Sequence, residues 1–285
     1  MTGFGTTAEN PELRDVRGPS ATGGGWRRFA DLLYLIAVTD FKKSYFGTVL
    51  GYFWSLARPV LLFAVLLAVF TQVFRIGSQV ENYPVLLLLN IVMFGFFQEA
   101  TVAAVTSVVA QEGVVRKTQF PRLVIPLAVV LTALFNLGMN LIAVFAFILA
   151  YGVEPAWTWL LFPLPAVALF VFTTAVAMIL SSLYVRFRDV AIIWSVLVAV
   201  LFYGTPILYP LEVVPDTLHD FLMVNPLTPI FEQMRAWIID PGAPGAVDAA
   251  GGVLYLLPAL AMYMGICALA VWVFNREAPR IAEEL

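Results

Sequence analysis

The sequence contains six apolar stretches, each long enough to cross a lipid bilayer. They comprise about residues 50–74, 85–110, 123–151, 158–184, 190–209 and 252–274. A transmembrane helix needs roughly 20 mostly apolar residues to cross the hydrocarbon core. Hydrophobic residues make up 61 % of the chain and charged residues only 12 %, against about 45–50 % and about 25 % in soluble domains. We therefore predict an all-α, polytopic membrane protein with six transmembrane helices.

The sequence lacks the motifs of common enzymes. The glycines at 23–25 are followed by Trp26, without the lysine that contacts phosphates in a nucleotide-binding loop. The single cysteine, Cys267, excludes a disulfide scaffold, and the single histidine, His219, excludes a site with two histidine ligands. The low charge content excludes a soluble enzyme and a nucleic-acid binder. We expect no catalytic residue, metal or cofactor on this chain, so energy from nucleotide must come from another polypeptide.

The basic residues are distributed unevenly between the two sides of the predicted helices. Most lie on the side of the N-terminus, whereas Arg75 and Arg235 lie on the other side and Arg58 lies within the first stretch. Cytoplasmic loops of membrane proteins carry an excess of lysine and arginine. We therefore predict that both termini are cytoplasmic. Residues 1–25 are rich in small residues, proline and charge, and we expect them to form a disordered tail.

Residues 26–46 are too charged to cross a membrane, but they have an amphipathic pattern. Arg27, Arg28, Asp31 and Lys42 share one helical face. The opposite face is apolar and consists of Trp26, Phe29, Leu33, Ile36, Ala37 and Phe41. Such a helix is suited to the headgroup plane of a membrane. We expect an interface helix here, with a soluble cytoplasmic helix as the alternative.

The loop over residues 111–122 is short, basic and ends near a proline. Its apolar side chains stand beside its basic ones; the residues of interest are Val114, Val115, Arg116, Lys117, Phe120 and Pro121. Apolar side chains on a water-facing loop indicate that a partner docks there. We interpret the loop as a short docking helix. The alternative is that its basic residues only anchor the loop on the cytoplasmic side.

The segment 210–240 is apolar and interrupted by prolines. Pro215 and Pro226 bracket one short helix, and Pro229 opens the next. Neither helix is long enough to cross the membrane. We expect two re-entrant helices in the outer leaflet, because lipid tolerates a turn only where protein or water covers it.

Glu99 lies near the middle of the second apolar stretch, next to Gln98. An ionised carboxylate at this depth costs on the order of 3 kcal/mol or more. Glu99 should therefore face a water-filled path, a partner helix or a basic group; the alternative is a protonated glutamate bonded to a neighbouring helix. Asn136 and Asn140 share one face of the third stretch. We expect these amides to join helices rather than to bind substrate.

Three phenylalanines, Phe94, Phe96 and Phe97, lie deep in the same stretch as Glu99. They could form a smooth wall past which sugar rings slide. Ordinary helix packing or contact with lipid is the alternative. The deep ionisable groups are essentially limited to Glu99, which favours a transporter over a membrane-embedded enzyme.

Four segments, in order, resemble the permease subunits of ABC-2 type polysaccharide exporters, which move lipid-linked O-antigen, teichoic acid and related glycans. The first is TDFKKSYFGTVLGYFWSLARPVL, which matches through Asp40, Lys42, Tyr45, Leu50, Gly51, Trp54 and Pro59. The second is KTQFPRLVIPL, through Phe120, Pro121 and Pro126. The third is VRFRDVAIIW, a cytoplasmic turn with Arg186, Phe187, Arg188, Asp189 and Val190. The fourth is the outer segment, through Pro206, Tyr209, Pro210, Pro215, Asn225, Pro226 and Arg235.

The resemblance implies a homodimer of this chain with two copies of a separate ATP-binding subunit, which would hold ATP and Mg²⁺. Residues 111–123 would be the coupling helix on that subunit, and 26–46 the interface helix where a lipid-pyrophosphate head enters. The outer helices of 210–240, with Tyr209, Asn225, Pro226 and Arg235, would form an outer gate. The channel would be lined by aromatic residues, among them Phe94, Phe96 and Phe97, with Glu99. The bacterial plasma membrane would be the location.

The sequence departs from the family pattern near the interface helix. Thr39, Ser44 and Phe46 stand where family members often have arginine or lysine. Capture of a pyrophosphate would then depend on Lys42, Lys43 and Arg58, beside Tyr45. The rival functions are an ABC-2 permease for a small hydrophobic drug or lipid, an integral membrane glycan transferase, and an ion channel with Glu99 in its pore.

Overall fold

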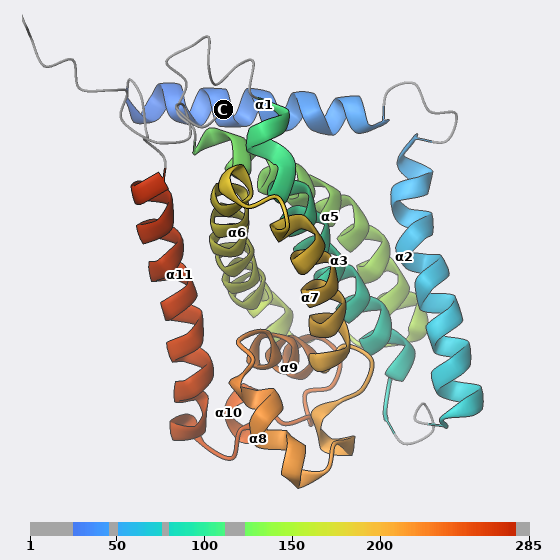
Figure 1. The fold of residues 1–285 in the computed structure, drawn as a ribbon. Coiled ribbons are helices and arrows are strands. Elements are labelled where there is room, and N and C mark those ends of the chain that lie inside the picture. Colours follow the sequence, from blue (N-terminus) through green and yellow to red (C-terminus); the bar gives the residue numbers. More distant parts are fainter. Residues whose placement is uncertain (1–24, 46–50, 76–79, 112–122, 278–285) are drawn as a thin grey trace, which may run out of the picture.

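The computed structural model describes residues 25–45, 51–75, 80–111 and 123–277, and the regular elements of these segments are helical (Figure 1). The long helices are α1 (Trp26–Tyr45), α2 (Gly51–Ala68), α3 (Tyr83–Ala110), α5 (Val124–Tyr151), α6 (Pro163–Arg186), α7 (Val190–Gly204) and α11 (Leu257–Glu277). The shorter ones are η1 (Val69–Val73), η3 (Trp157–Leu161), η4 (Leu211–Val213), α8 (Asp216–Val224), α9 (Leu227–Ile238), α10 (Ala246–Ala249) and η5 (Val253–Leu256). The predicted all-α class is confirmed.

Five helical stretches of the described chain are long and apolar enough to cross a membrane. They are Phe53–Val73, Tyr83–Ala110, Val124–Tyr151, Trp157–Arg186 and Val253–Arg276. Each coincides, within a few residues, with one of the predicted stretches. The chain passes from one end of the bundle to the other along each of them (Figure 1).

The sixth predicted stretch, 190–209, is helical only over α7, which ends at Gly204 after 15 residues. A helix of this length is roughly 22 Å long, whereas the hydrocarbon core is about 30 Å thick. Pro206 explains the early end, because a proline disfavours helical backbone in the residue before it. Thr205 is accordingly extended, with φ −112° and ψ 145°. The predicted helix was too long because the apolar composition continues past this break.

The backbone after α7 is buried and takes its hydrogen bonds from side chains of α3. Asn90 Nδ2 donates to the carbonyl oxygens of Pro206 and Ile207 at 3.3 and 3.2 Å. The Tyr83 hydroxyl donates to the carbonyl of Leu208 at 2.7 Å. Irregular backbone at membrane depth is tolerated only where protein or water satisfies its polar groups. The side chains of Tyr83 and Asn90 therefore satisfy backbone carbonyl groups that the non-helical segment after α7 exposes.

α3 forms the centre of the bundle, and α2 and α11 flank it (Figure 1). In the most hydrophobic part of α3, 78 % of the residues are buried. The corresponding shares are 6 % for Phe53–Val73 and 17 % for Val253–Arg276. The two flanking helices thus leave most of their apolar surface open to lipid or to another subunit.

The core packs aromatic rings of α3 against α6 and α7. Phe97, which is fully buried, stacks on Phe172 with ring centroids 6.0 Å apart and meets Trp194 edge-on at 6.1 Å. The indole N–H of Trp194 donates to the Thr101 hydroxyl oxygen at 3.1 Å. The buried indole is therefore satisfied within the core, as buried polar groups require.

α1 lies across one end of the bundle rather than along it (Figure 1). Phe29 and Ala37 are buried, and the Phe41 ring meets Phe135 of α5 at 5.7 Å. The Thr132 hydroxyl of α5 donates to the carbonyl of Ala37 at 3.2 Å. Trp26 stacks on Phe29 with ring centroids 5.8 Å apart, but it is 75 % exposed and does not pack on the bundle. α1 thus packs on α5 through part of its apolar face.

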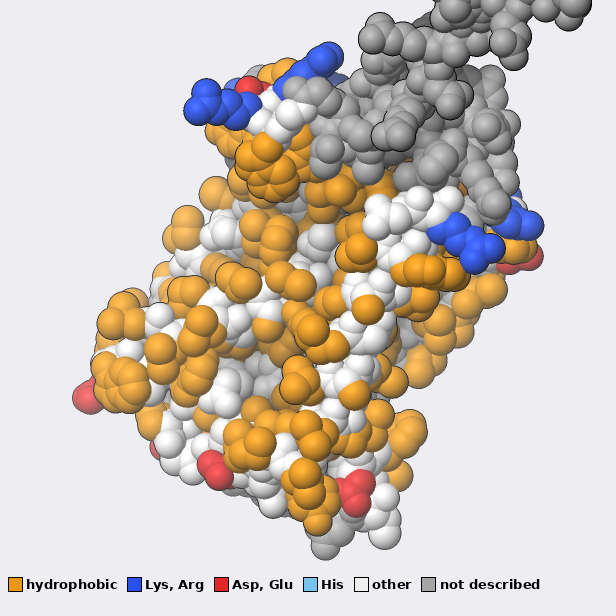
Figure 2. Space-filling model, turned by 90° about the vertical axis from the view of Figure 1, so that its left-hand side faces the viewer, with side chains coloured by type: hydrophobic (Ala, Val, Ile, Leu, Met, Phe, Trp, Pro, Cys, Tyr) orange, Lys and Arg blue, Asp and Glu red, His pale blue; other side chains and the backbone are white. Residues whose placement is uncertain are grey.

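The charged side chains concentrate at the ends of the bundle. Figure 2 shows lysine and arginine at the end that carries α1, acidic side chains mainly at the other end, and a mostly hydrophobic face between them. The first and last helical residues of the described chain, Trp26 and Glu277, lie at the same basic end (Figure 1). The opposite end carries α8, α9 and α10. An apolar band between polar ends is the surface expected of a protein embedded in a bilayer.

We predict that Asn90→Leu destabilises the protein, because the carbonyl groups of Pro206 and Ile207 would stay buried without a donor. An unsatisfied buried polar group costs about 1–3 kcal/mol. Thermal unfolding of the purified protein in detergent measures the effect. Ser107→Ala is the matched control on α3, since this buried hydroxyl bonds only the carbonyl of Ala104 in its own helix. Equal stability of the two variants would contradict the role assigned to Asn90.

Candidate functional site

A cavity of about 730 Å³ opens between α2, α3 and α5. The end of α1 contributes Ser44 and Tyr45 to its wall, and α7 contributes Phe202. Its polar lining consists of Ser44, Tyr45, Ser55, Arg58, Gln98, Glu99, Asn136 and Asn140. Its apolar lining includes Trp54, Pro59, Leu62, Ile91, Val92, Phe94, Phe96, Val102, Leu137 and Phe202. The cavity thus combines aromatic walls with a set of polar groups inside an otherwise apolar bundle.

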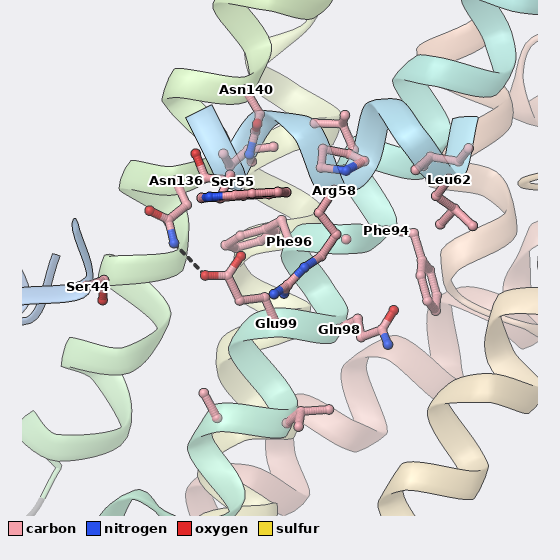
Figure 3. A pocket seen from close by; sticks show the side chains of 18 of the residues that line it. Ser44, Ser55, Arg58, Leu62, Phe94, Phe96, Gln98, Glu99, Asn136 and Asn140 are labelled. Atoms are coloured by element: carbon pink, nitrogen blue, oxygen red, sulfur yellow. Dashed lines mark hydrogen bonds between the residues drawn. The ribbon is translucent and has the colours of Figure 1, made fainter. Parts of the chain in front are cut away.

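Glu99 is joined to two other helices by hydrogen bonds. The side-chain amide of Asn136 on α5 donates to Glu99 Oε1 (Figure 3). The Tyr45 hydroxyl, at the end of α1, donates to Asn136 Oδ1 at 2.6 Å. One continuous chain of bonds therefore connects α1, α5 and α3. The sequence prediction that Asn136 joins helices is consistent with this position, although it did not identify the partners.

The remaining polar side chains face the cavity from three helices. The Arg58 side chain of α2 points towards Glu99, and its positive charge attracts the carboxylate (Figure 3). Gln98 on α3 is exposed to the cavity. Asn140 lies one turn along α5 from Asn136, and its buried Oδ1 accepts no hydrogen bond from the described residues. The position of Glu99 agrees with the predicted cavity and basic group, and equally with the alternative of a glutamate bonded to a neighbouring helix.

The three phenylalanines of the predicted channel do not share one surface. Phe94 and Phe96 line the cavity, and the Phe94 ring meets Phe202 at 5.4 Å. Phe97 lies outside the cavity lining and is packed in the core between α6 and α7. Successive residues on a helix point about 100° apart, so the adjacent Phe96 and Phe97 face different directions, and the Phe97 ring centroid lies 5.6 Å from that of Phe94. Phe97 therefore belongs to the core of the bundle and not to the wall of this cavity.

The residues predicted to receive a pyrophosphate lie in two places. Tyr45 and Arg58 line the cavity. Lys42 and Lys43 are exposed in the last turn of α1, outside the cavity lining, where Lys43 Nζ lies 4.0 Å from Asp40 Oδ1. An ion pair this exposed contributes little to stability. The predicted coupling residues Val114, Val115, Arg116, Lys117, Phe120 and Pro121 lie outside the described part of the chain.

The sequence matches the ABC-2 type transporter family over residues 31–239. The chain belongs to this family. It is similar to two proteins named O-antigen export system permease protein RfbA from Klebsiella pneumoniae, at 29 % and 30 % identity, each over 90 % of this chain and 95 % of the relative. A protein of the same name from Myxococcus xanthus is 29 % identical over 77 % of this chain and 84 % of its own length. The chain is an integral membrane subunit of a transporter.

The turn between α6 and α7 of this ABC-2 transporter chain carries Arg186, Arg188 and Asp189. All three are exposed at the end that carries α1. The guanidinium of Arg188 lies 5.0 Å from the centre of the Tyr184 ring, and that of Arg186 lies 5.5 Å from the Phe187 ring. The carbonyl of Asp189 accepts the N–H of Ile193 in the first turn of α7. These contacts are consistent with the predicted structural role of the turn.

At the opposite end, three of the predicted outer residues organise the chain between α7 and α9. The Tyr209 hydroxyl donates to the carbonyl of Tyr203 at 2.9 Å. Asn225 Oδ1 accepts the N–H of Leu227, while its amide donates to the Thr205 hydroxyl at 2.8 Å. Pro226 stands at the N-cap of α9. The side chain of Asn225 therefore links the start of α9 to the break after α7.

Arg235, the fourth predicted outer residue, is buried in an ionic cluster with two glutamates. Its Nη2 lies 3.0 Å from Glu212 Oε2, and its Nη1 lies 3.6 Å from Glu232 Oε2. Glu232 Oε1 accepts the N–H of Leu211 at 3.1 Å. Burial raises the pKa of Glu232 to about 7, although Arg235 and the Leu211 N–H favour its carboxylate form. Burial of the carboxyl is therefore the main reason that a proton is held near neutral pH, and the charge of Glu212 adds to it.

Sequence reasoning did not identify Asn90 or Glu232. Asn90 lies inside an apolar run, and its role depends on the backbone of a segment more than 100 residues later. Glu232 lies in the segment 210–240, whose prolines and apolar residues drew the prediction. Its position three residues before Arg235 on a short helix was the available signal, since such residues are neighbours on one helical face.

We predict that Glu232→Gln flattens the pH dependence of stability. The folded protein holds a proton on Glu232 up to about pH 7, whereas the ordinary pKa of the carboxyl is 4.5. Stability contributed by this proton is present at low pH and is lost as the pH rises from about 4.5 to about 7. Thermal unfolding between about pH 5 and about pH 8 measures the difference. Glu154→Gln is the control, because that side chain is exposed and is not part of the ionic cluster. Identical profiles for the wild type and Glu232→Gln would refute this assignment.

Proposed function

We propose that this chain is the transmembrane subunit of an ATP-driven exporter that moves a lipid-linked polysaccharide across the membrane. The observation that carries the proposal is the similarity to O-antigen export permeases over 90 % of the chain. The cavity supports it, because aromatic rings and amide groups together can replace the hydration of a sugar chain. A small hydrophobic drug would not require Glu99, Asn136 and Gln98 on the same wall.

The end of the bundle that carries α1 is the cytoplasmic end in this proposal. The positive-inside pattern of the sequence supports this orientation, with both termini in the cytoplasm of a bacterium and the chain in its plasma membrane. α1 then lies along the inner membrane surface as an interface helix. Lys42 and Lys43 are exposed there and would attract the anionic head of a lipid carrier by charge. Tyr45 and Arg58 would meet the head next, at the cavity.

The functional unit in this proposal is a homodimer with two ATP-binding subunits. The exposed apolar surface of α2, including Phe53, Leu61 and Val65, supports a second copy against the open side of the cavity. α7 with its non-helical extension would serve as a sixth span. ATP and Mg²⁺ would be held by the partner subunits, which residues 111–123 would contact. The outer helices α8 and α9 would fold back into the outer leaflet and close the exit.

We predict that reversing two charges in the proposed coupling segment, with Arg116→Glu and Lys117→Glu, uncouples ATP hydrolysis from export. The reversed charges would disturb the contact of this segment with the ATP-binding subunit, so that hydrolysis no longer moves the transmembrane helices. Surface glycan in a host strain that lacks the native gene measures export, and phosphate release by the purified complex measures hydrolysis. The same reversal at Arg14 and Arg17, in the predicted tail, is the control. Normal export by the Arg116/Lys117 variant would rule out this coupling site.

A further inference from the structure

We propose that Gly95 sets the width of the cargo path through the cavity, because the absence of a side chain at this position leaves room for a sugar ring. This inference rests on the proposed export function and concerns the same cavity. Gly95 lies in the interior of α3 and lines the cavity. The proposal follows from the position of Gly95 on the cavity wall and from the open space in front of it.

Gly95 lies at the middle of the face that α3 turns towards the cavity. Residues three and four apart on a helix share one face. Ile91 precedes Gly95 by one turn, Gln98 and Glu99 follow it by one turn, and all of them line the cavity. A side chain at position 95 would therefore enter the cavity between these neighbours.

The packing of the bundle does not explain a glycine at this position. Glycine inside a helix is less favourable than alanine, and membrane helices use it where another helix must approach closely. A Cβ atom built on Gly95 would have no neighbour within 4 Å among the described residues, apart from the backbone of its own helix. Its backbone is helical and has no positive φ that would favour glycine. A larger residue would thus change the width of the cavity and not the contacts of α3.

The space in front of Gly95 is bounded by other helices of the same chain. Arg58 of α2 and Asn136 of α5 line the same cavity, with their side chains on the sides towards Glu99 (Figure 3). Trp54 of α2 adds an aromatic ring to this wall. A polymer must bring every one of its rings past this level, so an obstruction here acts on the whole chain. One added methylene in a fitted pocket changes selection by about tenfold or more.

The test replaces Gly95 with alanine and with leucine in the full-length chain, expressed in its own host strain after deletion of the native gene. Surface glycan measures export, and phosphate release by the purified complex measures hydrolysis. We expect Gly95→Leu to lower export at least about tenfold and Gly95→Ala to lower it less. Hydrolysis should persist in both. Their unfolding temperatures in detergent should equal or exceed that of the wild type, because alanine and leucine favour a helix more than glycine does.

Gly138→Leu is the matched control on α5. A Cβ atom at Gly138 would also have no neighbour within 4 Å among the described residues outside the backbone of its own helix, but Gly138 does not line the cavity. The change in side-chain size and in helix preference is the same at both positions. We therefore expect normal export from Gly138→Leu.

Normal export by Gly95→Leu would overturn the proposal. A lower unfolding temperature or a failure to fold would also overturn it, because Gly95 would then be required for packing. Native mass spectrometry separates a third case, in which Gly95→Leu loses a second copy of the chain together with export. That result would assign Gly95 to a contact between copies and reject its role in the path. Unchanged surface glycan after deletion of the native gene would instead overturn the export function itself.

Discussion

Polar groups at membrane depth must find their partners inside the protein, and this constraint organises the whole structure. Water cannot satisfy them in the hydrocarbon core, so each unpaired group costs several kcal/mol. α3 supplies the partners at two levels. Near one end, Tyr83 and Asn90 bind the backbone after α7. At mid-height, Glu99 is bound by Asn136 of α5. The central position of α3 follows from these two roles.

Polar contacts also link the cavity to α1 at one end of the bundle, and α9 to the break after α7 at the other end. Tyr45 connects the cavity to α1 through Asn136, so displacement of α1 would disturb the partner of Glu99. At the other end, Asn225 connects α9 to the break after α7, and Arg235 connects α9 to Glu212. Aromatic packing joins α3 to α6 and α7, whereas polar contacts thus link α1 to the cavity and α9 to the break after α7. Such contacts suit the parts of a transporter that must move.

The sequence was sufficient to predict the helices but not their contacts. Runs of apolar residues located five candidate spans, because bilayer thickness sets their length directly. The end of α7 was missed because the chain stays apolar after Pro206, and the deciding partner, Asn90, is distant in sequence. Phe96 and Phe97 are adjacent and chemically identical, yet one lines the cavity and the other the core. Only the direction of each side chain in the folded helix separates them.

The central claim is that this chain is one part of an ATP-driven complex, and the composition of the purified complex tests it most directly. The tagged chain, of 31.4 kDa, would be extracted from its own host in mild detergent and weighed intact by native mass spectrometry. The account predicts a particle with two copies of this chain and two copies of a subunit that contains a nucleotide-binding loop. A chain that reproducibly purifies without any ATP-binding subunit would contradict it.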